Sequence, residues 1–265
     1  MQLQARSLGF EIDVWKSQHG AVHSCFDRAI NLSIEGELWT VLGAGQPDAP
    51  FGVGLALCDQ LADLGVQAGD RVFVRAGYLR LGPRIVDCRS ARHWTLEPWG
   101  TPVGDLAARL CSVERVAGPR AWSGSASLAA QLAAGLCGSD ADLERAVRRS
   151  VGRGPGLTPS GDDVLVGMLA VLTATGSADA ARLAGALAPL LRTTPDISRH
   201  LLLQAARGLP GRAIHQLGKA LCEGAGHEAA LDAVLSTGAT SGADASLGLV
   251  AACRLSFLPA ERLAS

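Results

Sequence analysis

The sequence has few aromatic and few charged residues. Aromatic side chains make up 4% of the 265 residues, so small aliphatic side chains must fill most of the interior. Charged residues make up 18% and the formal net charge is −1, which leaves no field to attract nucleic acid. Because apolar residues are abundant, the chain can bury enough surface to fold. We therefore predict a folded protein with no nucleic-acid partner.

Long apolar runs and paired cysteines are also missing. No segment has roughly 18 unbroken apolar residues, and the first residues lack an apolar core behind a basic start. The seven cysteines include no C-x-x-C pair. Such an odd, scattered set is typical of reduced thiols. We expect a cytoplasmic protein with no membrane partner.

Two periodicities divide the chain near residue 100. Before it, short runs alternate with period two, most clearly where Ile30, Leu32 and Ile34 alternate with polar neighbours. After Pro102, apolar residues recur with a period near 3.6 in segments broken by Gly, Pro or Ser. This predicts an α+β fold: a β-rich domain over 1–101, as a sheet or small barrel, followed by a mainly α-helical domain over 102–265.

The same periodicities predict the individual elements. Strands are expected at 28–34, 38–42, 51–57, 71–76 and 78–81, with turns at Glu35-Gly36 and Ala76-Gly77 and one helix near 55–64. Helices are expected at 103–115, 125–137, 140–151, 162–175, 178–191, 195–207, 211–222, 227–236 and 244–255. The fourth of these helices is apolar on every face, so we expect it at the centre of the helical domain.

The loop GRGPGLTPSGDD, residues 152–163, is the main candidate for ligand chemistry. Its glycines allow backbone conformations that other residues resist. Because the loop leads into a helix, its amides coincide with the positive end of the helix dipole, which favours a bound anion. We predict a phosphate or carboxylate ligand at this loop.

Asp162 and Asp163 complicate this interpretation, because two carboxylates would repel a bare anion. A magnesium ion held by Asp162 and Asp163 would remove the conflict, since Mg²⁺ commonly binds through carboxylates and substrate phosphates. No other cofactor is indicated. The alternative is that Ser160 and Asp163 form a capping box at the helix start.

The start of this helix is repeated later in the chain. Residues 160–167 read SGDDVLVG and residues 241–248 read SGADASLG, so Ser, Gly, Asp and Gly recur at four matching positions. Both starts could face one ligand, or both could be capping boxes. A third start, at Thr193 and Thr194, has Pro195 at its first helical position and Thr194 as its cap. If the three starts converge, Thr193 and Ser198 could also contact the ligand.

At GLTPSGDD the sequence resembles a bacterial family that includes a subunit of oxamate carbamoyltransferase. The resemblance spans most of the chain and has three further parts. These are His23-Ser24-Cys25-Phe26 with Asn31-Leu32, then Thr193-Thr194 with Ile197-Ser198, and finally Gly238, Ser241, Gly242 and Asp244. Where members of the family carry a His after the late Gly, this sequence has Ala239.

The resemblance implies a subunit of a hetero-oligomeric carbamoyltransferase in allantoin degradation, a branch of purine catabolism. That enzyme exchanges a carbamoyl group between oxalurate and phosphate. Loop amides suit the charge that develops on such a substrate. Two other functions stay open: a non-catalytic ligand-binding or scaffolding subunit, and a stand-alone magnesium-dependent phosphoryl or acyl transfer enzyme.

Candidate site residues follow from the loop, the repeat and the resemblance together. The catalytic candidates are Asp162, Asp163 and Asp244. The substrate-binding candidates are Gly154, Gly156, Thr158, Ser160, Gly161, Thr193, Thr194, Ser198, Ser241, Gly242, His23 and Asn31.

Overall fold

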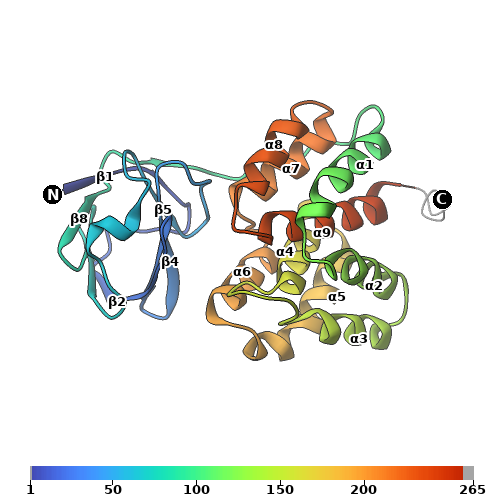
Figure 1. The fold of residues 1–265 in the computed structure, drawn as a ribbon, viewed down its shortest axis with the longest axis horizontal. Coiled ribbons are helices and arrows are strands. Elements are labelled where there is room, and N and C mark those ends of the chain that lie inside the picture. Colours follow the sequence, from blue (N-terminus) through green and yellow to red (C-terminus); the bar gives the residue numbers. More distant parts are fainter. Residues whose placement is uncertain (1, 259–265) are drawn as a thin grey trace. The chain divides into compact units, whose positions relative to one another are not determined.

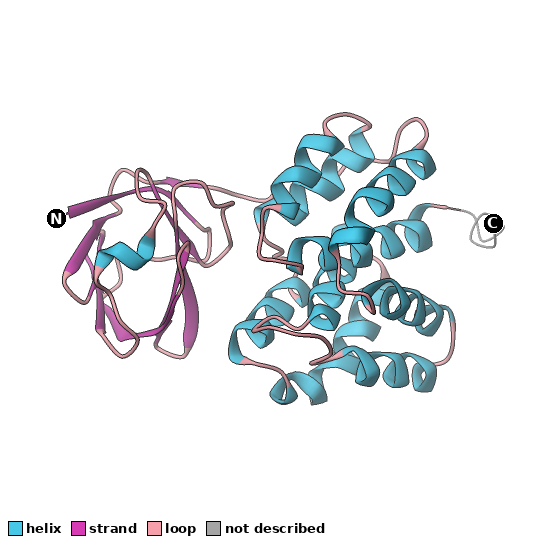
Figure 2. Ribbon diagram, viewed as in Figure 1, coloured by secondary structure: helices cyan, strands magenta, loops and turns pink. Residues whose placement is uncertain are grey.

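The computed structural model describes residues 2–258 and has the predicted α+β fold, strands first and helices after (Figures 1 and 2). Residue contacts group the chain into two compact units, Met1–Leu96 and Glu97–Ser265. Each unit has its own buried apolar core. The two units are therefore described one at a time.

The first unit is a closed barrel. Its strands are β1 (Gln2–Leu8), β2 (Gln18–Cys25), β3 (Ala29–Ile34), β4 (Glu37–Leu42), β5 (Gly52–Leu55), β6 (Arg71–Arg75), β7 (Tyr78–Leu81), β8 (Arg84–Asp87) and β9 (Arg92–His93). The order β5-β4-β3-β2-β6-β7-β8-β1 closes through antiparallel pairing of β1 with β5, and β9 pairs with β1 outside this ring. Closure leaves the ring without an unpaired edge.

Alternation and turn chemistry explain the antiparallel hairpins. Along β6 every second residue is buried, so Val72 and Val74 face the core while the arginines face solvent. The β3–β4 turn places Glu35 and Gly36 at φ 49° and 90°. Two consecutive positive φ values are what a two-residue hairpin turn with the strands' twist requires. The turn predicted at Glu35-Gly36 is therefore confirmed.

Sequence periodicity missed four strands and misassigned one helix. Within β2, Val22 is the one fully buried residue, so its apolar pattern was too weak to detect. Pairing with β3 and β6 makes it a strand.

The helix expected near 55–64 is wrong in extent, because most of that segment is not helical. The segment instead holds only a 3₁₀ turn, Leu61–Leu64, which buries Leu61 and Leu64 and ends at Gly65.

The second unit has nine α-helices within the described residues. They are α1 (Leu106–Ala117), α2 (Ser125–Cys137), α3 (Asp140–Ser150), α4 (Ser160–Ala174), α5 (Ala178–Leu187), α6 (Asp196–Ala206), α7 (Arg212–Glu223), α8 (His227–Leu235) and α9 (Ser241–Phe257). Each corresponds to one predicted helix. Between residues 2 and 258, no helix is both long and apolar enough to cross a membrane.

The helices α4 and α9 pack together at the centre of this unit (Figure 1). A side chain at Gly167 would overlap the carbonyl oxygen of Ala245, and one at Gly248 would overlap that of Val164. These contacts are reciprocal, because Gly167 and Gly248 occupy matching positions of the repeated sequence. The last residue of the repeat thus lets the two helix backbones touch.

Candidate functional site

The serines of the repeat lie inside their helices and do not cap them. Pro159 is the N-cap of α4 and Thr240 is the N-cap of α9, and neither helix has a side-chain cap hydrogen bond. The capping box predicted for Ser160 and Asp163 is therefore wrong. Ser160, Asp163 and Asp244 are buried, with at most 6% of their surface exposed. Their side chains therefore do not bind the free amides at their own helix ends.

Asp162 binds the start of the loop and the start of α6. Its Oδ1 accepts a hydrogen bond from the Gly152 amide at 2.8 Å. Its Oδ2 accepts hydrogen bonds from the hydroxyls of Thr194 and, at 2.5 Å, Ser198. The sequence predicted Thr194 as the cap and Pro195 as the first helical residue, but Pro195 is the N-cap of α6, so the helix begins one residue later than predicted. Both Asp162 oxygens are engaged, which makes this residue a link between three segments.

The two starts of the repeat meet at a group of side chains that we call the α4–α9 cluster: Thr158, Ser160, Asp163, Ser241 and Asp244. Ser160 is included because it lies one helical turn before Asp163 on α4. The hydroxyl oxygens of Thr158 and Ser241 are 2.8 Å apart and share a hydrogen bond. Burial raises the pKa of Asp163 to about 8, and the nearby carboxylates of Asp244 and Asp162 act in the same direction. Hydrogen bonds with Ser241 and Thr158 oppose this rise in pKa only in part. Asp163 is therefore mainly neutral at pH 7.

Asp244 is fully buried but has stronger hydrogen-bond support. Its Oδ1 accepts hydrogen bonds from the Trp122 amide at 2.9 Å and from the Ser125 hydroxyl at 2.6 Å. Sequence reasoning missed Trp122 and Ser125, because Ser125 is one of several serines in a small-residue segment and a backbone amide leaves no sequence signal. Only the folded structure brings the start of α2 against α9.

Three oxygens of the cluster have no hydrogen-bond partner among the described residues: Ser160 Oγ, Asp163 Oδ2 and Asp244 Oδ2. Within residues 2–258 only two other buried side-chain atoms, Arg6 Nε and Trp94 Nε1, share this condition. Leaving buried polar atoms unpaired is costly, and such atoms in a folded protein call for a ligand, a water or a functional role. Their concentration in one cluster marks it as the candidate site.

The loop glycines adopt the conformations that the sequence suggested. Gly152, Gly154 and Gly156 have φ of 71°, 104° and 93°. Gly154 packs against Ser160, where a side chain would be too close. The Gly161 amide donates to the Arg153 carbonyl at 2.8 Å and the Gly242 amide to the Thr237 carbonyl at 3.1 Å. Those two amides are therefore engaged within the protein.

Other predicted site residues lie outside the cluster. Thr193 is exposed, and its hydroxyl donates to the Leu190 carbonyl at 2.7 Å. His23 and Asn31 belong to the barrel unit, where the Ser24 hydroxyl lies 3.1 Å from His23 Nδ1 and accepts from Asn31 Nδ2 at 3.1 Å. Asn31 Oδ1 also accepts from the Thr40 hydroxyl at 2.8 Å. Their role in ligand binding stays a prediction.

No group of three or more His, Cys, Asp or Glu side chains within residues 2–258 could hold a metal ion. The two carboxylates predicted to bind magnesium differ in their surroundings. Both oxygens of Asp162 accept hydrogen bonds from protein donors, whereas Asp163 keeps one oxygen without a partner among the described residues. Magnesium binding stays a prediction, and of these two residues only Asp163 has an oxygen without a hydrogen-bond partner among the described residues.

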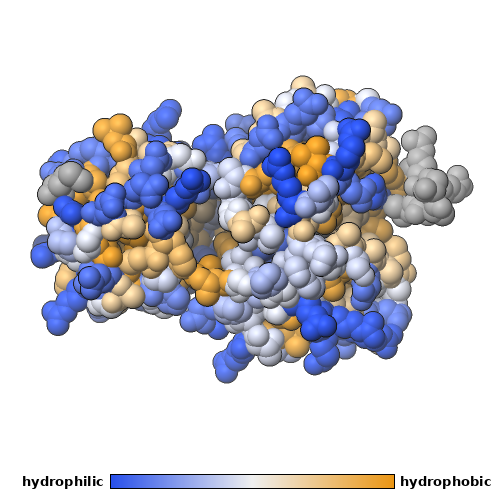
Figure 3. All heavy atoms as spheres, in the orientation of Figure 1, coloured by the Kyte–Doolittle hydropathy of each residue, from blue (hydrophilic) through white to orange (hydrophobic). Residues whose placement is uncertain are grey.

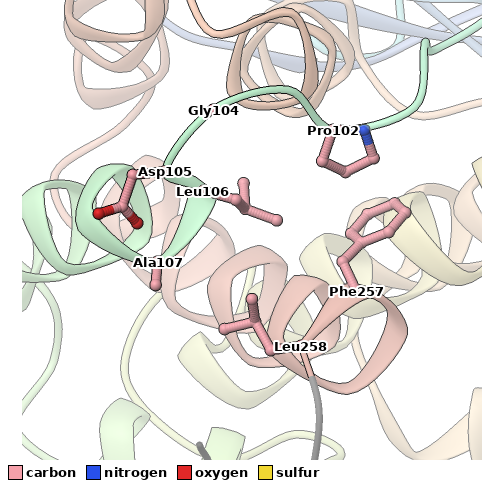
Figure 4. Close-up of a pocket in the computed structure, with 7 residues that line it drawn as sticks. All are labelled: Pro102, Gly104, Asp105, Leu106, Ala107, Phe257 and Leu258. Carbon is pink, nitrogen blue, oxygen red and sulfur yellow. The ribbon is translucent and has the colours of Figure 1, made fainter.

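The cavities in the helical unit include one beside the candidate loop and one without a predicted site residue. One, of about 490 Å³, lies beside the beginning of the loop and is lined by Leu128, Gln131, Arg148, Arg149, Val151, Gly152 and Arg153. The other, of about 370 Å³, is shown in Figure 4, where Leu106 and Phe257 point into it and the Asp105 carboxylate points away. No predicted site residue lines the second cavity.

Comparison with known families agrees with the resemblance seen at GLTPSGDD. Residues 6–93 match the AllH family N-terminal domain, and residues 150–253 match the family described as oxamate carbamoyltransferase subunit AllH. The chain belongs to the AllH family. The second match contains the whole loop and both helix starts of the α4–α9 cluster. No solved structure matches the chain.

Proposed function

We propose that this protein is a subunit of a carbamoyltransferase-type enzyme that acts on oxamate or oxalurate and carbamoyl phosphate. Its loop at 152–163 and the α4–α9 cluster would bind the small anionic substrate. The description of the family supports the reaction class. The grouping of three unpartnered buried oxygens supports the position of the site.

A neutral Asp163 would resolve the charge conflict between the anion and the acidic residues of the loop. Because its pKa is about 8, this side chain carries a proton at pH 7 and does not repel an anion. A protonated carboxyl in a buried site can donate a hydrogen bond to a carbonyl or carboxylate oxygen. Such a donor, fixed in place before the reaction, would stabilise charge that develops on the carbamoyl oxygen.

Asp244 would play the complementary role. Its Oδ1 is held by two protein donors, and its Oδ2 has no partner among the described residues. This oxygen could accept a hydrogen bond from the N–H group of a carbamoyl or oxamate amide. The pair would then recognise both edges of an amide, with Asp163 donating to C=O and Asp244 accepting from N–H. Asp162 would act as a positioning residue that holds the loop.

The experiment is carbamoyl transfer from oxalurate to phosphate, measured with this protein alone and with the other subunits of the enzyme. A subunit should show no turnover alone. In the assembled enzyme we expect Asp163→Ala to lower kcat/KM at least about 100-fold, as the loss of one buried transition-state donor does elsewhere. The exposed Asp232→Ala variant on α8 is the control and should keep its activity.

Two results would contradict the proposal. Turnover by this protein alone would instead support a stand-alone enzyme. Full activity of Asp163→Ala in the assembled enzyme would show that the cluster is only structural. Isothermal titration with oxalurate and carbamoyl phosphate measures binding without turnover. Compared with the changes in kcat and KM, it separates lost binding from lost chemistry.

A further inference from the structure

The 490 Å³ cavity beside the loop has a strongly positive lining. Arg148 and Arg149 come from the last turn of α3, and Arg153 comes from the loop. No carboxylate lines this cavity. In the described part of the chain none of the three guanidinium groups forms an ion pair, although Arg145 on the same helix pairs with Asp142. Positive charge is therefore concentrated there without compensation.

We propose that this cavity binds the oxyanion group of a small molecule, a phosphate or a carboxylate. Guanidinium groups offer paired N–H donors in a planar fork that fits both kinds of oxyanion. Gln131, from α2, adds a neutral side chain that can donate a hydrogen bond, and Leu128 and Val151 supply an apolar wall. The lining is mostly polar, and its three arginines are exposed to solvent, so an anion can reach them without a change in the fold.

Helix capping accounts for only part of this arrangement. Arg148 and Arg149 lie where basic residues favour a helix C-terminus, so each of them alone could serve that purpose. Arg153 lies beyond the helix end and Gln131 belongs to another helix, so capping explains neither. In Figure 3 the surface over α3, at the lower right of the helical unit, is hydrophilic.

The proposed site is separate from the α4–α9 cluster, although Gly152 and Arg153 of its lining belong to the loop at 152–163, and it does not depend on carbamoyl transfer. None of the three arginines belongs to the cluster, and the cluster residues do not line this cavity. The cavity does include Gly152, whose amide is bonded to Asp162. An oxyanion bound here would therefore lie next to the segment that holds the loop in place.

The test is isothermal titration of the full protein with inorganic phosphate and with oxalate at constant ionic strength. We expect at least one anion to bind. Arg153→Gln and the double variant Arg148→Gln/Arg149→Gln should each weaken it by about 10-fold or more, as the loss of charge-assisted hydrogen bonds does. Arg145→Gln is the matched control, since it removes the same charge from α3 outside the cavity, and it should leave the affinity nearly unchanged.

Several outcomes would overturn the site. If neither anion binds the wild type, the cavity does not recognise oxyanions. If Arg145→Gln lowers the anion affinity as much as the cavity variants do, the effect comes from overall charge and not from a defined site. A loss of thermal stability in the α3 variants together with unchanged anion affinity would assign these arginines to helix capping. Preference for phosphate over oxalate, or the reverse, identifies which oxyanion the cavity selects.

Discussion

The starts of α4 and α9 share a sequence motif but hold their acidic residues in different ways. At α9, Asp244 receives hydrogen bonds from the Trp122 amide and the Ser125 hydroxyl. At α4, burial raises the pKa of the matching Asp163 to about 8. The motif also has Asp162 at α4 where α9 has Ala243. The repeated glycines set how the two helices pack, whereas the neighbouring segments determine what each carboxyl can do.

The largest loss of stability is expected from the glycines at matching positions of α4 and α9, Gly167 and Gly248. Gly167→Ala or Gly248→Ala would push a side chain into a backbone carbonyl of the other helix. We expect a loss of more than about 3 kcal/mol of stability, because the helix axes would have to separate. Urea denaturation measures this loss.

Gly185→Ala on α5 is the control for this prediction, since a side chain there would meet nothing within 4 Å. It should leave stability unchanged or raise it by up to about 1 kcal/mol, because Ala favours a helix over Gly. If Gly167→Ala and Gly248→Ala behave like Gly185→Ala, the close helix contact is not needed for stability.

A smaller loss of stability is expected at Asp162, the position where the start of α4 differs from the start of α9. Asp162→Ala leaves the Gly152 amide and the hydroxyls of Thr194 and Ser198 without their acceptor. We expect it to cost about 2–3 kcal/mol, the usual penalty for buried donors left unpaired. Hydrogen exchange should also become faster at the Gly152 amide. An Asp162→Ala protein as stable as the wild type would show that this link contributes little.

The charge state of Asp163 predicts a pH dependence. An unfolded Asp titrates near pH 4, so between about pH 4 and pH 8 the folded protein holds one proton more than the unfolded chain. Within this window stability should fall as pH rises, by about 1.4 kcal/mol per pH unit from this residue. Above pH 8 the contribution is lost and the dependence levels off.

Asp163→Asn isolates that contribution, because Asn has similar shape and does not titrate. The difference in stability between wild type and Asp163→Asn should move in favour of the wild type as pH falls from 7.5 to 5.5, a range chosen inside the window between about pH 4 and pH 8. Taking the difference removes the contribution of the histidines. A difference that does not change with pH would mean that Asp163 is ionised in the folded protein.

The smallest effect concerns the hydrogen bond between the two starts. Thr158→Val and Ser241→Ala each remove one side of the 2.8 Å contact between the hydroxyls. A double-mutant cycle should give a coupling energy of about 0.5–1.5 kcal/mol, which is typical of a neutral hydrogen bond. Additive effects would show that the two starts are adjacent without being coupled.

The repeated motif and the loop could be found from the sequence because they depend on residue type. Glycine, serine and aspartate at matching positions in 160–167 and 241–248 are visible without a structure. The donors at Trp122 and Ser125, by contrast, come from a different helix start, and one of them is a backbone amide. The capping role was misassigned because a Ser-x-x-Asp sequence fits both a cap and a first turn whose side chains face a neighbouring helix.

By itself, the sequence determined the division into a β-rich and a helical part and the nine α-helices of the described residues, and it indicated the candidate loop, since periodicity and turn residues act over short distances along the chain. It also identified the family, through GLTPSGDD. Only the tertiary structure decided that β2 completes a closed barrel, that both Asp162 oxygens are hydrogen-bonded while burial raises the pKa of Asp163, and that three arginines share one cavity. Those properties depend on which distant segments bury a group or donate to it, and burial and charge are set by the folded surroundings.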